Sequence, residues 1–258
     1  MSPTAADRTF AAADTVLATT LGAMVAFGLA AAAQAFTGFG SALVAVPLIA
    51  VLTDPVTAIV STTCVSVGIS AYGAIKERRN IERTNAKRLT ISGLVGIPIG
   101  ALALHYLDVN ALKLVIGCVL LSAVMLSLLG VEVRNSPRAE ITGGIIGGAL
   151  LTSTGMNGPP IVLVTYGSSK SALTKRATLQ IVFLAHDLIA IVFFCVMKLI
   201  DVEVLLLSVA GLIVTPGGWA LGNSIFARLS ARSFKIASTT VLGAVALVAV
   251  VGGIAAYS

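Results

Sequence analysis

The chain has 258 residues, of which 57% are hydrophobic and only 11% are charged. Soluble globular domains carry about 25% charged residues, so this composition excludes an ordinary soluble protein. The formal net charge is +6, and the basic residues lie between apolar runs. This placement indicates that they orient the protein in the membrane and do not bind nucleic acid. The runs reach about 18 residues, long enough to cross a bilayer, and lack the alternation of barrel strands. We predict an all-α polytopic membrane protein.

A polar N-terminal tail is predicted at residues 1–14, followed by a first apolar run at 15–33. Asp7, Arg8 and Asp14 precede this run, whereas a secretory signal begins with a positively charged region. We therefore expect the run to be retained as a helix.

Apolar segments then follow one another to the end of the chain, five in each half. They are predicted near residues 15–35, 41–53, 56–75, 88–106 and 111–130, and near 139–153, 158–168, 172–197, 204–226 and 233–256. At about 1.5 Å per residue, segments 41–53 and 158–168 are too short to be full spans. We predict half-helices there, either in broken spans or in re-entrant hairpins.

The two halves resemble each other. Residues 34–55 and 151–172 are both apolar stretches interrupted by Gly and Pro, and the pairs Pro98/Gly100 and Pro216/Gly218, like Lys113 and Lys235, occupy similar later positions. Such paired interruptions are typical of secondary transporters built from repeats. The predicted domains are a first membrane repeat at 15–130, a linker at 131–138 and a second membrane repeat at 139–258.

Basic residues predict the orientation. Every Lys and Arg other than Arg8, Lys113 and Lys198 lies in one of four segments: 76–88, 131–140, 168–176 and 228–235. Positively charged loops stay in the cytoplasm, so both termini are predicted outside, and the linker inside. An odd number of crossings in each half makes the repeats inverted with respect to the membrane.

Each Gly-rich interruption is predicted to begin a half-helix at membrane depth. Gly40 and Gly158 permit a positive φ, Ser41 and Asn157 are N-cap residue types, and Pro159-Pro160 suits a helix start. Two such helix N-termini facing each other would bind an anion. The alternative is that Gly and Pro serve only tight helix packing. The candidate residues are Thr37, Gly38, Phe39, Gly40, Ser41, Thr154, Gly155, Met156, Asn157 and Gly158.

The segment after the second interruption carries polar residues on two faces. Arg176, Gln180 and Asp187 share one helix face, and His186 points about 100° away, toward the side of Thr178. Gln34, Arg176, Thr178 and Gln180 are candidate lining residues of the anion site. His186 and Asp187 are candidates for proton coupling; the alternatives are a structural histidine, an aspartate paired near the outer end, and uniport.

Other motifs are missing from the sequence. It contains no Walker-type phosphate loop, no nucleophile elbow of a hydrolase and no metalloprotease motif. Its three cysteines do not have the spacing of metal ligands. We expect no enzyme activity, no cofactor, no metal and no nucleic-acid partner. The glycine pairs at 143–144 and 147–148 offer a surface for a homodimer, or for packing within one chain.

Three motifs together resemble the sulfite exporter family of the TauE/SafE type, over residues of about 20 to 250. They are Gly38-Phe39-Gly40-Ser41 after a small-residue helix, Gly155-Met156-Asn157-Gly158-Pro159-Pro160, and Lys175-Arg176-Ala177-Thr178 at the start of the next helix. The resemblance implies a carrier in the bacterial inner membrane that exports small sulfur-containing anions such as sulfite, sulfoacetate or related organosulfonates. The alternatives are a small-anion channel and a carrier for a non-sulfur organic anion.

Overall fold

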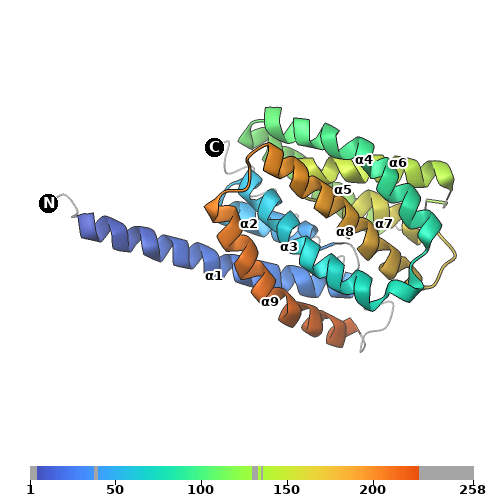
Figure 1. Ribbon diagram of the computed structural model, residues 1–258, viewed down its shortest axis with the longest axis horizontal. Coiled ribbons are helices and arrows are strands. Elements are labelled where there is room, and N and C mark those ends of the chain that lie inside the picture. The colour runs from blue at the N-terminus through green and yellow to red at the C-terminus, as the bar shows by residue number, and fades with distance from the viewer. Residues whose placement is uncertain (1–4, 38–39, 130–132, 135, 227–258) are drawn as a thin grey trace.

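The computed structural model describes residues 5–37, 40–129, 133–134 and 136–226, and all regular structure in these ranges is helical (Figure 1). The elements are α1 (Ala5–Thr37), α2 (Ala42–Leu52), α3 (Pro55–Lys76), a 3₁₀ turn η1 (Arg78–Asn80), α4 (Arg83–Tyr106), α5 (Val109–Leu129), α6 (Pro137–Thr154), α7 (Gly158–Tyr166), α8 (Ala172–Val196) and α9 (Val202–Phe226). The all-α prediction is confirmed. The predicted last segment, 233–256, lies outside the described residues, and α1 extends into the predicted N-terminal tail.

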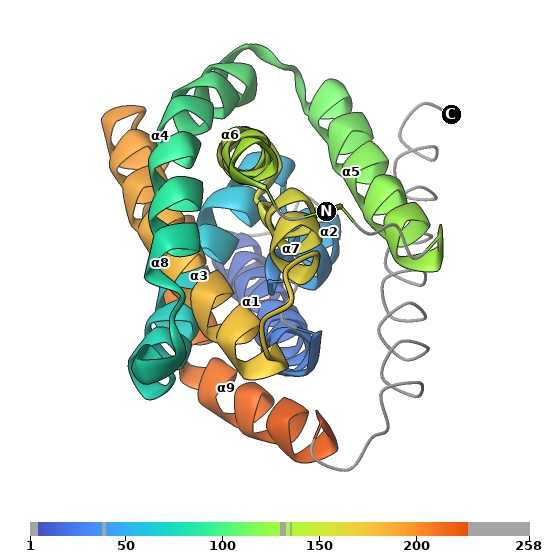
Figure 2. The same ribbon diagram turned by 90° about the vertical axis from the view of Figure 1, so that its right-hand side faces the viewer.

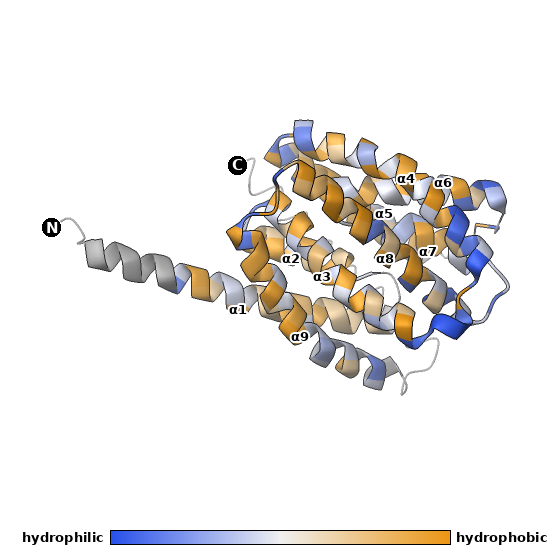
Figure 3. Cartoon of the chain, in the orientation of Figure 1, coloured by the Kyte–Doolittle hydropathy of each residue, from blue (hydrophilic) through white to orange (hydrophobic). Residues whose placement is uncertain are grey.

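Within the described ranges, six helices are long and apolar enough to cross a membrane: α1, α3, α4, α5, α8 and α9. Figure 3 shows hydrophobic residues along the bundle and hydrophilic residues gathered at its ends, most densely where α4 begins. The chain is therefore a multi-pass membrane protein.

Polar residues set where several helices begin. The Asp54 carboxylate accepts hydrogen bonds from the first backbone N–H groups of α3, at 2.8 and 3.1 Å. The hydroxyls of Ser136 and Ser171 do the same for α6 and α8. Pro55 and Pro137 follow two of these caps, in the first turn, where the missing N–H costs nothing.

The two predicted half-helices form hairpins with the helices before them. Helix α2 has 11 residues and α7 has 9, so they rise only about 17 and about 14 Å. Gly22 of α1 lies against Leu52 at the far end of α2, and Gly147 and Gly143 of α6 lie against Ile161 and Val164 of α7. Both short helices therefore run back along their predecessors. They lie in the middle of the bundle, surrounded by longer helices (Figure 2).

The longer helices are joined by two close pairs, α4 with α6 and α1 with α9. A methyl group at Gly100 of α4 would overlap the backbone carbonyl of Ala149 in α6. In the same way, a methyl group at Gly218 of α9 would overlap the carbonyl of Gly28 in α1. Residue numbers rise together along each contact, so both pairs are parallel. Each pair joins the first helix of one half to the fourth helix of the other.

The glycine pairs of α6 are occupied within the chain. Gly143 and Gly147 face α7, while Gly144 lies against Ser92 of α4 and Gly148 against the backbone of Gly93. These glycines were expected to serve either a homodimer or packing within one chain, and in the structure they serve packing within one chain. A homodimer stays a prediction that needs another surface.

Neighbouring glycines of α9 allow a direct test of the close pairing. Gly218→Ala should lower the melting temperature of the detergent-purified protein by several degrees, because the new methyl group forces α9 from α1, at a typical cost of about 1–3 kcal/mol. Gly217→Ala is the matched control, since nothing lies within 4 Å of a methyl group there. It should leave the protein as stable or slightly more stable. Equal effects of the two substitutions would contradict the packing described here.

Candidate functional site

Helix α8 presents one polar face to α3 and another to α4. The contacts with α3 are Arg176 with Glu77, Gln180 with Gly73, and Asp187 with Ser66. The contacts with α4 and the residue before it are Thr178 with Glu82, and His186 with Leu89 and Gly93. The predicted division of α8 into these two faces is confirmed.

Two buried glutamines connect α1 to α8. Gln34 Nε2 donates a hydrogen bond to Gln180 Oε1 at 3.2 Å, and the two residues are 0% and 1% exposed. Gly73 leaves room for this arrangement, because a methyl group there would stand 2.8 Å from Gln180 Cγ. The other amide atoms, Gln34 Oε1 and Gln180 Nε2, have no partner in the structure. Gln180 therefore keeps an N–H donor for another group.

The first helix interruption lies beside this pair. Gly40 has φ of +96°, and Ser41 is the N-cap of α2. The predicted positive φ at Gly40 is confirmed, but the Ser41 side chain makes no capping hydrogen bond. Its hydroxyl has no partner although the residue is only 2% exposed. Gly38 and Phe39 lie outside the described residues, and Thr37 is the last residue of α1.

The second interruption turns at a different glycine from the one predicted. Gly155 takes the left-handed conformation with φ of +76°, whereas Gly158 is already the first residue of α7. The prediction for Gly158 is wrong, because the chain reverses immediately after Thr154 to end α6, with Gly155 as its C-cap. The two prolines that follow Gly158 occupy the first turn of α7, as predicted.

Asn157 at this interruption matches Ser41 at the first. It is the N-cap of α7, makes no side-chain capping bond, and is 5% exposed. Its Nδ2 has no partner. Met156 belongs to the apolar core, and the Thr154 hydroxyl donates to the Leu150 carbonyl at 2.7 Å. These two side chains therefore have structural roles, and Asn157 is the polar group that remains available.

The second interruption packs against the half-helix that the first one begins. A methyl group at Gly155 would stand 2.8 Å from Val46 of α2, one turn beyond Ser41. On the other side, Phe183 of α8 is the nearest group to Gly40. The turn before α7 thus contacts the first half of α2, and Gly40 lies beside Phe183, about one turn along α8 from Gln180.

This region holds several hydrogen-bond donors without acceptors. Buried polar groups in proteins are almost always paired, so unpaired ones need an explanation. The side-chain donors here are the Ser41 hydroxyl and the Asn157 and Gln180 amides. The first N–H groups of α2 and the Gly158 N–H of α7 add partial positive charge, whereas Pro159 and Pro160 carry no N–H. Such a set suits a compact anion and needs no buried cation.

Arg176 does not belong to this donor set. Its partly buried guanidinium forms an ion pair with the buried Glu77 carboxylate, with Nε at 3.2 Å from Oε2, and it also donates to Asn223 of α9 at 3.4 Å. The positive charge of Arg176, which was expected to bind an anion, is neutralised by the Glu77 carboxylate at the end of α3. The expected lining role of Arg176 therefore lacks support in this geometry.

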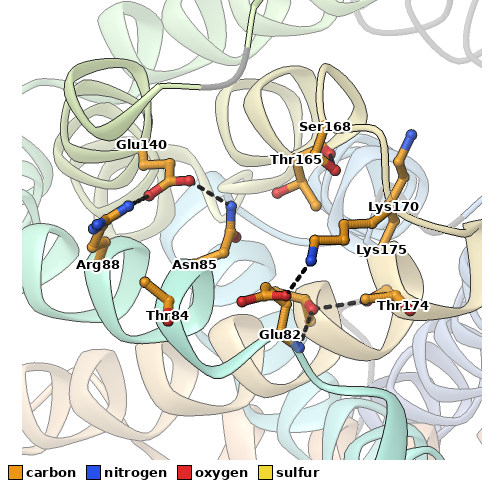
Figure 4. Close-up of a pocket in the computed structure, with 11 residues that line it drawn as sticks. Glu82, Thr84, Asn85, Arg88, Glu140, Thr165, Ser168, Lys170, Thr174 and Lys175 are labelled. Carbon is orange, nitrogen blue, oxygen red and sulfur yellow. Dashed lines mark hydrogen bonds and ion pairs between the residues drawn. The ribbon is translucent and has the colours of Figure 1, made fainter.

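Thr178 faces a polar pocket at the end of the bundle where α8 begins. Its Oγ1 accepts a hydrogen bond from the Glu82 backbone N–H at 3.0 Å and donates to Thr174 O. The pocket has a volume of about 130 Å³ (Figure 4). Two ion pairs lie in it, Lys170–Glu82 at 2.9 Å and Arg88–Glu140 at 3.0 Å.

Glu140 is a buried residue of this pocket that the sequence analysis missed. It accepts hydrogen bonds from Asn85 and Arg88 of α4, both at 3.0 Å. A signal was present: Glu140, Gly144 and Gly148 recur every four residues, so the carboxylate shares the glycine face of α6 that packs on α4.

His186 and Asp187 have different surroundings. His186 Nε2 lies 3.2 Å from the Leu89 carbonyl, and its ring fills the space left by Gly93. Asp187 accepts one hydrogen bond, from Ser66 at 2.7 Å, and forms no ion pair with any described residue. The histidine thus fits the structural role weighed above, while the aspartate is the buried carboxyl whose role packing does not explain.

The ion pair between Arg176 and Glu77 can be tested as a stabilising contact. Arg176→Gln should destabilise the protein by about 3 kcal/mol, because it leaves the Glu77 carboxylate buried without a partner. Adding Glu77→Gln should recover most of that loss in thermal unfolding of the purified protein. A double variant no more stable than Arg176→Gln alone would contradict the role assigned to this pair.

One of three comparisons with known proteins gives a match. The family model described as Sulfite exporter TauE/SafE matches residues 23–249, which include both helix interruptions and all of α8. No curated protein and no solved structure matches the chain. The match covers most of the sequence, and the chain therefore belongs to the sulfite exporter TauE/SafE family.

Proposed function

We propose that this protein exports small sulfur-containing anions, such as sulfite, sulfoacetate or related organosulfonates, across the bacterial inner membrane by alternating access. Family membership supports anion export. The observation that carries the proposal is the set of buried donors without acceptors at the two helix interruptions: the Ser41 hydroxyl, Asn157 Nδ2 and Gln180 Nε2. Sulfite and sulfonate groups present compact clusters of oxygens that such donors can bind.

The proposed mechanism requires two inverted repeats that move about a central site. The helix pairing supports this arrangement, since Gly100 meets Ala149 and Thr152 as Gly218 meets Gly28 and Ala31. The partner residues are three apart in both pairs, so the same contact recurs in the same register. In this proposal α1 corresponds to α6 and α4 corresponds to α9.

The proposed orientation places the connections before α4 and α8 in the cytoplasm and both termini outside, because segments 76–88 and 168–176, which include the first turns of these helices, hold nine of the 17 basic residues. An anion leaving a cell with a negative interior is driven outward by about 2.3 kcal/mol per charge per 100 mV. Export thus needs no ATP-binding motif. It requires only that the binding site open to the two sides of the membrane in turn.

Flux measurements with an Asn157 variant test the site. Asn157→Leu should raise the KM for sulfite or sulfoacetate flux into proteoliposomes at least tenfold, because a hydrogen bond to a charged group contributes about 1.5–3 kcal/mol. Asn110→Leu is the matched control, since the same amide is removed at an exposed residue near the start of α5. It should leave the flux unchanged.

The possible results separate the parts of the proposal. If the native protein moves neither anion, the substrate class is wrong, and a wider anion screen follows. If flux is unchanged in Asn157→Leu, the substrate assignment stands, but Asn157 does not belong to the binding site. Flux far above carrier rates, without counter-flow of labelled anion, would favour the channel alternative.

Asp187 is the stronger of the two proton-coupling candidates. Its carboxyl is buried with one hydrogen bond, and an ionisable group inside a membrane commonly marks a proton or ion path. If it couples transport to protons, native flux should respond to an imposed pH gradient, and Asp187→Asn should lose that response while still moving anion. An identical pH response in both proteins would remove Asp187 from the coupling path, and the absence of a response in the native protein would indicate uniport.

A further inference from the structure

A groove on the outer surface between α4 and α6 lies away from the proposed transport site. Its volume is about 630 Å³. Its lining runs along α4 from Arg83 to Val95. Figure 3 shows that hydrophilic residues gather at the end of the bundle where α4 begins. The lining residues are Arg83, Thr84, Lys87, Arg88, Ile91, Ser92, Val95, Ile141 and Ile145.

Cations line one end of the groove. Arg83 and Lys87 are exposed, and among the described residues neither forms an ion pair. Arg88 is beside them, with its guanidinium 3.0 Å from Glu140. Two positive charges at this end therefore remain without a carboxylate partner.

The rest of the groove is apolar. Ile91 and Val95 continue the four-residue spacing of Arg83 and Lys87 along α4, and Ile141 and Ile145 of α6 form the opposite wall. Ile91, Val95 and Ile141 are 45–56% exposed, on the face that such a protein turns to lipid. One continuous groove thus offers charge at the membrane surface and hydrocarbon contact below it.

A second groove shows that helix packing does not require these cations. It has a volume of about 400 Å³, lies between α1 and α9, and is lined by Thr20, Met24, Val202, Leu205, Leu206, Val209, Ala210 and Ile213. In the register that aligns Gly100 with Gly218, Lys87 and Arg88 of α4 correspond to Leu205 and Leu206 of α9, and Arg83 corresponds to Asp201. The same parallel packing is therefore built without a cation at any of these three positions.

We propose that the α4–α6 groove binds an anionic phospholipid from the leaflet on the side of the basic loops. Its phosphate would lie between Arg83 and Lys87, with an acyl chain along Ile91, Val95 and the α6 isoleucines. Basic pockets between transmembrane helices are a recognised way to bind anionic head groups, and each basic side chain near such a surface contributes about 1 kcal/mol. The inference concerns the lipid surface and holds whether or not the proposed substrate is right.

The test compares two phospholipids with identical acyl chains, phosphatidylglycerol and phosphatidylcholine, added to the full-length protein in neutral detergent. Bound lipid is counted by native mass spectrometry, and affinity is measured by lipid titration of the melting temperature. The native protein should prefer phosphatidylglycerol. Arg83→Gln with Lys87→Gln should weaken phosphatidylglycerol binding about 30-fold, from about 1 kcal/mol for each of two cations.

The matched control is Arg78→Gln with Arg79→Gln. These residues form part of η1, are exposed, lie at the same end of the bundle, and do not line the groove. The control removes the same charge, so a general effect of net charge or orientation would appear in both double variants. It should keep the native preference.

Three results would overturn the proposal. The first is a native protein that binds both lipids equally, and the second is an equal loss in the two double variants. The third is full competition by soluble glycerol phosphate, which would make the basic end a site for free anions.

Discussion

The structure depends on how two interrupted helices are accommodated inside an apolar bundle. Each interruption leaves backbone groups without helical partners, and hydrocarbon offers them nothing, so such breaks occur only where protein or a cavity surrounds them. Here α2 and α7 are enclosed by the longer helices, and Gly40 and Gly155 supply the positive φ angles for the reversals. The cost of breaking two helices is a reason to regard these buried helix ends as functional.

Around these ends, α8 separates charged groups from neutral ones. Glu77 neutralises Arg176 at one level of the helix, while one turn further on Gln180 presents an amide next to Gln34. An anion bound by amides, a hydroxyl and helix ends is held less tightly than one paired with a buried guanidinium. That difference matters for transport, because a ligand that must leave has to be bound weakly enough to be released.

Much of the fold could be predicted from hydrophobic runs, and the short segments 41–53 and 158–168 correspond to α2 and α7. Residues whose partners lie far along the chain were harder. The two faces of α8 follow from helical spacing. Spacing alone cannot show that Glu77 forms an ion pair with Arg176, or that Glu140 is buried. Which glycine turns the chain, Gly155 or Gly158, depends on where α6 ends, and two glycines only three residues apart make that boundary ambiguous.

The crossed pairing of α1 with α9 and α4 with α6 has a consequence for biogenesis. When the first half has been inserted during synthesis, α1 and α4 both lack the helices against which their closest contacts are made. The first half is thus an incomplete unit that must persist in the membrane until translation supplies α6 and then α9. Contacts between residues so far apart in the sequence form late. Until then, the insertion machinery must protect the surfaces of α1 and α4 that will contact α9 and α6.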